Sequence, residues 1–403
     1  MVDALAGSLD RELVERASTF HCQACGTQGL VGFYAVQGIP TQTTVLLDTE
    51  GDAKRFPVGE LLLGFCTQCA LIQNVLFDQA LIDYSVPTEE SQAFSPLFSA
   101  YADDLADRLV DGLSLNGRSV LEVGCGKGDF LNLLSQRGIG RGVGIDPGFL
   151  PERLDGGGAD LEFIRDYYGP RHLDLTGDLV VARHLMEHVP NTRQFLEWLG
   201  ASVRATEAAS LFIEVPDASR ILEEGAFWDV YYEHCTYFTQ DSLASALSLS
   251  NMEVDRVEPG FDDQYLLAWA SPGQGQPLPA DPLTVEADAE RIAGFASKAG
   301  QRVEYWRSKI EDELEVGRPV AVWGASSKAV AFLAAVGSPP VIAVDINVHK
   351  QGKWLPGVVA EVRPPESLAL LRPDLVIPMN PIYEKEIRAD LIAMGLDSAV
   401  EPL

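Results

Sequence analysis

The glycine-rich run VLEVGCGKGDF at residues 120–130 constrains the fold of this 403-residue chain more than any other segment. Its apolar start predicts a short buried strand, and its three glycines (Gly124, Gly126 and Gly128) predict a turn in which the backbone approaches a ligand closely. The run FLNLLSQRG that follows has the spacing of an amphipathic helix. Asp146 ends the next apolar run, at the position from which a carboxylate binds the hydroxyls of a ribose. We therefore expect an α/β domain that binds a nucleoside-containing cofactor.

The glycines alone do not identify that cofactor, because a dinucleotide-binding loop or an ordinary tight turn has the same outline. Glu122, inside the strand and two residues before the first glycine, separates these alternatives. A carboxylate there repels a pyrophosphate but suits the ammonium group of an amino-acid-bearing cofactor. The pattern E-x-G-x-G-x-G with the later Asp146 resembles the first two motifs of the Rossmann-like S-adenosylmethionine methyltransferases. The resemblance implies that S-adenosylmethionine contacts Glu122, the three glycines and Asp146, and we add Asp166 and His184, which follow the third and fourth expected strands.

The acidic composition of the chain limits its partners. It has 59 Asp and Glu against 30 Lys and Arg, a formal net charge of −29, which argues against nucleic acid or an anionic membrane as a partner. The first residues are charged and amphipathic, unlike a signal peptide, and the longest apolar stretch, 319–345, is too interrupted by Gly, Lys and Pro to span a bilayer. We expect a soluble, cytoplasmic protein with a small-molecule substrate. Nothing in the sequence indicates its oligomeric state.

Four of the six cysteines form two C-x-x-C pairs, Cys22 with Cys25 and Cys66 with Cys69. Two such knuckles place four thiolates for the tetrahedral coordination that zinc prefers. The runs VGFYAV, TTVLL and ELLLGFC between the pairs predict strands that bring the knuckles together. No fifth ligand is evident, so we expect a structural Zn²⁺ site, with redox-active or merely buried cysteines as the alternatives. Cys125 and Cys235 are interpreted as small packing residues.

The alternation of apolar runs and helical patterns divides the chain into three expected domains: 1–83 (zinc-binding), 84–275 (cofactor-binding) and 276–403 (a second α/β unit). A helix is expected at 89–113, ahead of the cofactor-binding sheet. Its strands are expected near 119–123, 141–146, 161–164, 178–183, 210–215, 252–258 and 264–270. No helical pattern separates the last two strands, which indicates an antiparallel hairpin.

The C-terminal unit follows a Gly- and Pro-rich linker at 271–282 and a long polar helix at about 284–315. Its run PVAVWGASSKAVAFL again predicts strand, loop and helix, and its second strand ends at Asp345. Lys328, at the expected N-terminus of that helix, is a candidate contact for a substrate phosphate. The loop has a single glycine where dinucleotide folds need more, so a packing or lid domain is an equal alternative.

The densest group of acid–base side chains is the segment YYEHCTYF at 231–238. A histidine titrates near neutrality, a neighbouring carboxylate raises its basicity, and a tyrosine hydroxyl donates to a developing oxyanion. These groups suit removal of a proton next to a carbonyl. Because ligands of open parallel sheets lie beyond the carboxyl ends of the strands, we expect this segment to meet Tyr84 and His188 at one site. Alternatively, Glu233 and His234 anchor a loop, and His188 packs beside the cofactor.

The zinc knuckles, the central domain and the C-terminal segments GASSKA, DIN and KQGKWLPG together resemble the sugar C-methyltransferases over nearly the full length. Those enzymes act on nucleotide-linked 4-keto-deoxysugars. The resemblance implies a seven-stranded class I methyltransferase sheet flanked by a small zinc-binding N-terminal domain and a C-terminal Rossmann-like α/β domain. It also implies that His234 deprotonates the carbon beside the keto group and that Glu233 orients it. Tyr231 then stabilises the enolate, while His188 and Tyr84 border the sugar.

Other functions fit the same sequence. An O- or N-methyltransferase, or a C-methyltransferase of a non-sugar substrate, needs the same cofactor loop. A non-catalytic zinc protein that binds S-adenosylmethionine also retains it, although the acid–base segment at 231–238 counts against a pure binder. An oxidoreductase using the C-terminal unit predicts nicotinamide binding.

Overall fold

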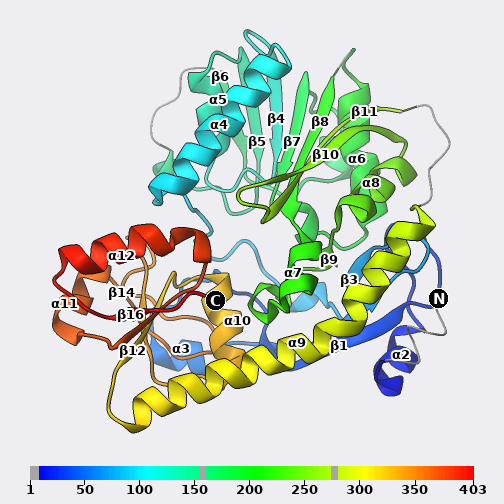
Figure 1. Cartoon of the computed structure of the whole chain (residues 1–403). Coiled ribbons are helices and arrows are strands. Elements are labelled where there is room, and N and C mark those ends of the chain that lie inside the picture. The colour runs from blue at the N-terminus through cyan, green and yellow to red at the C-terminus, as the bar shows by residue number, and fades with distance from the viewer. Residues whose placement is uncertain (1–8, 155–159, 208, 274–279) are drawn as a thin grey trace.

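The computed structural model describes residues 9–154, 160–207, 209–273 and 280–403. Within these residues the strands form three sheets of four, seven and five strands (Figure 1). The seven-stranded sheet occupies one end of the molecule, and the two smaller sheets lie side by side at the other. The α-helices are α2 (Arg11–Ala17), α3 (Glu50–Lys54), α4 (Pro96–Gly112), α5 (Asp129–Gln136), α6 (Thr192–Arg204), α7 (Ala218–Glu224), α8 (Gln240–Leu249), α9 (Pro282–Glu315), α10 (Ser327–Val336), α11 (Leu368–Leu371) and α12 (Glu384–Ala393). The 3₁₀ helices are η1 (Gln79–Leu81), η2 (Pro151–Arg153), η3 (Pro170–His172), η4 (Met186–His188), η5 (Phe227–Asp229), η6 (Pro365–Ser367) and η7 (Pro381–Tyr383).

The N-terminal sheet is antiparallel and has the order β1-β2-β3-β9. Its strands are β1 (Val31–Pro40), β2 (Val58–Phe65), β3 (Ile72–Asn74) and β9 (Thr236–Tyr237). The strands expected from VGFYAV and ELLLGFC are confirmed. The strand expected from TTVLL is wrong: this segment makes only isolated bridges, from Val45 to Thr88 and from Leu47 to Trp354. Each bridge has a different remote partner, so no ladder extends.

The seven-stranded sheet has the order β10-β11-β8-β7-β4-β5-β6. Its strands are β4 (Ser119–Val123), β5 (Arg141–Ile145), β6 (Asp160–Ile164), β7 (Leu179–Arg183), β8 (Ser210–Pro216), β10 (Met252–Gly260) and β11 (Tyr265–Pro272). All seven coincide with expected strands. Strand β11 runs antiparallel to both of its neighbours, so the expected final hairpin is also confirmed.

Helices cover both faces of this sheet because each presents one apolar face to it. Residues of α4 and α5 pack with one side of the strands, and residues of α6 and α8 pack with the other. Helix α4 begins at Pro96 and not at the expected 89, because Ser95 caps it by accepting a hydrogen bond from the Phe98 N–H. Residues ahead of Ser95 are therefore free to line the space beyond the sheet.

The C-terminal sheet is parallel, with the order β14-β13-β12-β15-β16. Its strands are β12 (Val320–Trp323), β13 (Ile342–Val344), β14 (Val362–Arg363), β15 (Leu375–Pro378) and β16 (Ala399–Val400). The expected long helix is α9, which runs past the N-terminal strand β1 toward the C-terminal sheet (Figure 1). Much of the expected linker, residues 274–279, lies outside the described residues. Among the described helices none combines the length and hydropathy needed to cross a membrane.

The segment after β8 leaves the middle domain and packs against both of its neighbours. Strand β9 completes the N-terminal sheet by pairing with β3. Residues of α7 and η5 belong to the same hydrophobic cluster as residues of β1, α9 and α10. Phe227 of η5 stacks on Phe332 of α10, with ring centroids 6.0 Å apart. Residues 218–237 therefore connect all three parts of the chain.

Candidate active site

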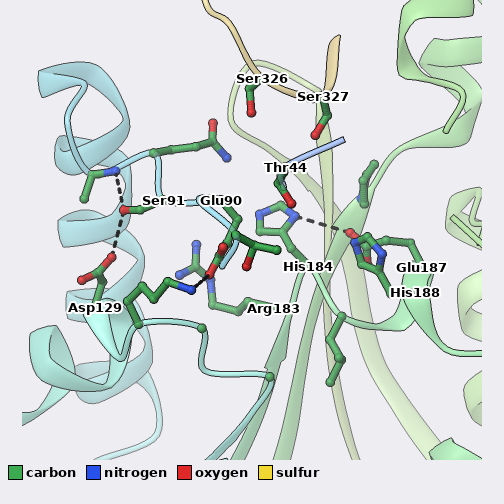
Figure 2. Close-up of a pocket in the computed structure, with 18 of the residues that line it drawn as sticks. Thr44, Glu90, Ser91, Asp129, Arg183, His184, Glu187, His188, Ser326 and Ser327 are labelled. Atoms are coloured by element: carbon green, nitrogen blue, oxygen red, sulfur yellow. Dashed lines mark hydrogen bonds and ion pairs between the residues drawn. The ribbon is translucent and has the colours of Figure 1, made fainter. Parts of the chain in front are cut away.

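A cavity of about 1330 Å³ lies at the carboxyl ends of β4, β5 and β7, where all three domains meet. Its walls include Tyr84, Gly124, His188, His234 and Lys328. Single small-molecule sites usually occupy about 300–1,000 Å³, so this space accommodates a cofactor and a second molecule. Figure 2 shows Ser91 and Asp129 on one side of it and His184, Glu187 and His188 on the other. Ser326 and Ser327 enter from the C-terminal domain.

The glycine loop between β4 and α5 forms one end of the cavity. Gly128 has φ +86°, and a Cβ there would lie 2.8 Å from the Phe163 ring, so both conformation and space require glycine. The loop is fixed by Asp146, which follows β5. Its carboxylate accepts hydrogen bonds from the N–H groups of Gly126, at 3.0 Å, and Gly148, at 2.7 Å. The loop and the carboxylate expected to bind a ribose are thus held together.

Several buried polar atoms near this loop have no hydrogen-bond partner among the described residues. They are Glu122 Oε2, Arg183 Nη2, His184 Nε2 and Glu187 Oε2, and all four residues line the cavity. A buried polar group without a partner costs about 1–3 kcal/mol, so such atoms mark where a ligand's polar groups bind. Burial also raises the pKa of Glu122 to about 8, although Arg183 opposes the shift. These residues fit a cofactor that brings its own cationic and hydrogen-bonding groups.

His184 and Asp166, which were also expected to contact the cofactor, differ from each other in their surroundings. His184, directly after β7, has φ +48°, an uncommon conformation for a residue with a side chain, and its ring contacts Tyr265 with centroids 4.5 Å apart. Asp166 pairs with Arg171 at 2.8 Å and lies near His172 at 3.4 Å. The neighbouring Tyr167 and Tyr168 line the cavity, whereas the Asp166 carboxylate is directed to Arg171.

The expected acid–base residues meet in the cavity around His234. Its ring lies edge to face with the ring of Tyr231, with centroids 4.6 Å apart, and with the ring of His188, with centroids 4.8 Å apart. The backbone N–H of Cys235 donates to the carbonyl of Glu187 at 2.6 Å, which ties this segment to η4. Burial, followed by the neighbouring His188, lowers the pKa of His234 well below its usual value. His234 is therefore neutral near pH 7 and able to accept a proton.

Tyr84 and His188 also meet as expected. The Tyr84 hydroxyl lies 2.8 Å from Nδ1 of His188, and the two rings are perpendicular. Glu187 is the carboxylate beside the histidines: one of its oxygens and the ring nitrogens of His188 and His234 all lie within 4.8 Å of one another. The sequence did not single out Glu187, although it directly precedes His188.

The Glu233 carboxylate is held by a residue of the N-terminal domain. It accepts hydrogen bonds from the N–H of Thr43, at 3.0 Å, and from the Thr43 hydroxyl. Burial raises the pKa of Glu233, and His188 opposes the shift. Thr43 lies in the TTVLL segment, which had been interpreted as a strand, so sequence reasoning missed this partner.

Tyr231 and Lys328 are linked through Asp229, another residue that the sequence did not single out. The Tyr231 hydroxyl donates to Asp229 Oδ1 at 3.0 Å, and the Lys328 ammonium pairs with the same oxygen. Arg220 donates to the other oxygen at 2.7 Å. Burial opposes ionisation of Asp229, but Lys328 and Arg220 outweigh it and lower its pKa to about 2.

The four knuckle cysteines converge in the N-terminal domain. The Sγ atoms of Cys22 and Cys69 are 3.5 Å apart, as are those of Cys25 and Cys66. Four thiolates around a zinc ion lie ~3.8 Å apart, given a Zn–S distance of about 2.3 Å. Both knuckles also share one backbone pattern, in which the first cysteine accepts from the residue four positions later, at 2.9 Å. The donor set and its spacing fit tetrahedral zinc.

Known protein families match two parts of the chain. Residues 95–257 match a methyltransferase domain, and residues 285–396 match the C-methyltransferase C-terminal domain. The C-methyltransferase NovU of Streptomyces niveus is 25% identical over 391 residues, which cover 91% of this chain and 90% of that protein.

Solved structures match less than half of the chain. An S-adenosylmethionine-dependent methyltransferase from Clostridium acetobutylicum ATCC 824 has 8% identity and a TM-score of 0.34, covering 44% of this chain and 92% of that one. Magnesium protoporphyrin IX methyltransferase from Synechocystis PCC 6803, with bound SAH, has 13% identity and a TM-score of 0.34, covering 46% and 90%.

The strand order of the middle sheet, the glycine loop and the matched domain define a class I, S-adenosylmethionine-dependent methyltransferase. The match to the C-methyltransferase C-terminal domain and the similarity to NovU indicate methyl transfer to carbon within this class. The chain thus combines a methyltransferase domain with a C-methyltransferase C-terminal domain and is similar to a C-methyltransferase along most of its length.

Proposed function

We propose that this C-methyltransferase adds a methyl group to the carbon next to the ketone of a nucleotide-linked 4-keto-deoxysugar. The observation that carries the proposal is the convergence of Tyr84, His188, Tyr231 and His234 in the same cavity as the glycine loop. An unactivated carbon is a poor nucleophile, so a C-methyltransferase needs a base and an oxyanion stabiliser as well as a methyl donor.

His234 is the proposed base. It is neutral near pH 7 because of its lowered pKa, and it lies between Tyr231 and His188. It takes the proton from the carbon beside the ketone, and the Tyr231 hydroxyl stabilises the resulting enolate oxygen. Glu187 stabilises the imidazolium that forms, because one of its oxygens lies within 4.8 Å of a ring nitrogen of each histidine. Glu233 acts through Thr43 as an anchor for the segment.

S-adenosylmethionine, when bound, supplies an electrophilic methyl group. Glu122 and Asp146 are the proposed partners of its ammonium and ribose hydroxyls, and Gly124, Gly126 and Gly128 allow the backbone to approach it. His184, with its unpartnered Nε2, completes this end of the cavity.

The nucleotide diphosphate is proposed to bind toward the C-terminal domain. Arg153 of the middle domain and Lys350 of the C-terminal domain line the cavity there, a region with two cationic groups in a strongly acidic protein. Each is held by a carboxylate: Glu89 pairs with Arg153 at 2.5 Å, and Asp345 pairs with Lys350 at 3.2 Å. A diphosphate needs such a region because the field of the whole chain repels it.

The cysteine cluster is proposed to hold one structural Zn²⁺. The two knuckles supply all four ligands, so the site is closed and has no open coordination position. The metal then fixes the turns that flank β1 and β2.

The proposal is tested by deuterium exchange. Candidate nucleoside diphosphate 4-keto-deoxysugars are incubated with the protein in deuterated water without methyl donor, and mass spectrometry follows label at the carbon next to the ketone. We expect label to enter with the wild-type protein and not with His234→Asn. Methyl transfer to a sugar that shows no exchange would overturn the enolate mechanism and favour O- or N-methylation.

A further inference from the structure

The first two residues of helix α10 contact the catalytic segment of the middle domain. Lys328 pairs with Asp229, and the Ser327 hydroxyl lies 2.8 Å from that of Thr43, which donates to Glu233. A hydroxyl has one proton, so Thr43 accepts the hydrogen bond of Ser327 while it donates to the carboxylate. Helix α10 thus reaches both carboxylates that flank Tyr231.

Apolar packing supports these polar contacts. Phe332, one turn further along α10, stacks on Phe227 at the start of η5. Asp229 ends the same 3₁₀ helix. The helix therefore buries η5 and holds its terminal carboxylate at the same time.

The ion pair at Asp229 has a consequence for Tyr231. In the described structure the Tyr231 hydroxyl donates to Asp229, so its proton faces this carboxylate and not the cavity. To stabilise an enolate, the hydroxyl must redirect that proton to the substrate. Asp229 then loses one of its three donors but keeps Lys328 and Arg220. Two remaining cations keep the buried carboxylate ionised, so the change in direction costs little.

Lys328 is poorly suited to bind a phosphate. Its ammonium is already paired with a carboxylate whose pKa is held at about 2. A phosphate there would have to displace Asp229 from Lys328, which would leave that buried carboxylate with Arg220 as its cationic partner.

We propose that Lys328 is a positioning residue for enolate formation, which acts through Asp229 on the Tyr231 hydroxyl and does not bind the substrate's phosphates. This inference rests on the proposed function. In addition to its proposed part in binding the diphosphate, the C-terminal domain then orients the Tyr231 hydroxyl of the middle domain through Lys328 of α10.

The test compares Lys328→Met with Lys309→Met, a control in the same domain whose ammonium pairs with Glu401 at 2.8 Å outside the cavity. We measure kcat, KM for the nucleotide sugar and deuterium exchange, together with the affinity for thymidine diphosphate by calorimetry. For Lys328→Met we expect kcat and exchange to fall about 10- to 100-fold, while KM and diphosphate affinity stay within about threefold. Lys309→Met should match the wild type.

A Lys328→Met protein that keeps its kcat, or that loses diphosphate affinity and raises KM about tenfold, would overturn the proposal. Lys328→Arg retains the charge and should recover part of the lost kcat.

A double-mutant cycle that combines Lys328→Met with Asp229→Asn distinguishes loss of their contact from a general folding defect. The double variant should be no slower than the slower single variant, because both act on one contact, and additive losses would contradict the proposal. Absence of exchange and methyl transfer in both wild type and Lys309→Met would instead refute the proposed function.

Discussion

The imidazole rings of His188 and His234 lie edge to face, with centroids 4.8 Å apart and an angle of 88° between their planes. Two imidazolium ions at that separation repel each other in a buried site. Burial and this neighbour lower the pKa of His234, so protonation there is opposed twice. The pair explains how a histidine stays an unprotonated base in a protein with a net charge of −29.

The pH dependence of kcat/KM should reflect this arrangement. A base whose pKa is lowered remains deprotonated to lower pH, so activity should persist below the usual histidine value of about 6.5 and fall only in more acidic buffer. In His188→Asn one cause of the lowered pKa is removed, so the acidic limb should move to higher pH. A limb that stays in place in His188→Asn would contradict the assignment.

Replacement of His234 should separate binding from chemistry. His234→Asn should lower kcat by about 10²- to 10⁴-fold, because the proton acceptor is lost. Calorimetry with S-adenosylhomocysteine should show unchanged affinity, since the glycine loop and Asp146 are untouched. Loss of cofactor binding together with activity would show that His234 has a structural role.

Cofactor binding should release protons from Glu122. With a pKa raised to about 8, this carboxyl is mostly protonated at pH 7, and an incoming ammonium favours the ionised form. The enthalpy of S-adenosylhomocysteine binding should therefore depend on the ionisation enthalpy of the buffer. The dependence should vanish in Glu122→Gln, and equal slopes for both proteins would rule out the ammonium contact.

Tyr84→Phe tests the contact with His188 at the border of the proposed sugar site. It removes one hydrogen bond, measured at 2.8 Å, and leaves the perpendicular ring contact. We expect kcat/KM to fall about 5- to 30-fold, because the lost hydrogen bond is worth about 1–2 kcal/mol. An unchanged kcat/KM would remove Tyr84 from the site.

Elemental analysis should find one zinc per chain. Cys66→Ser should release it and lower the midpoint of thermal unfolding, because the closed site stabilises the turns around β1 and β2. Cys235→Ala is the matched control, since Cys235 is equally buried but lies outside the cluster. Full metal content in Cys66→Ser would refute the four-cysteine site.

Local signals in the sequence were sufficient for the seven-stranded sheet and the glycine loop. Apolar runs such as 120–123 are buried on both faces and need no knowledge of their neighbours to be recognised as strands. The cysteine knuckles and the His234 segment are likewise local patterns. Their residues could be named before their surroundings were known.

The partners of those residues could not be predicted in the same way. Glu233 binds Thr43, 190 positions away, and Lys328 binds Asp229, 99 positions away. Such contacts depend on how three domains assemble and leave no periodicity in the chain. The adjacency of Glu233 and His234 in sequence suggested a pair, but it gave no sign that Glu187 also lies beside the two histidines.

Strand β9 has a consequence for how the protein is made. Its two residues cover the edge of β3, yet they emerge from the ribosome about 160 residues after that strand. At 5–20 residues per second, the N-terminal sheet waits roughly 10 to 30 s with an unpaired edge, a template for unwanted strand pairing. Early metal binding by the knuckles would hold that sheet in shape until the catalytic segment arrives to close it.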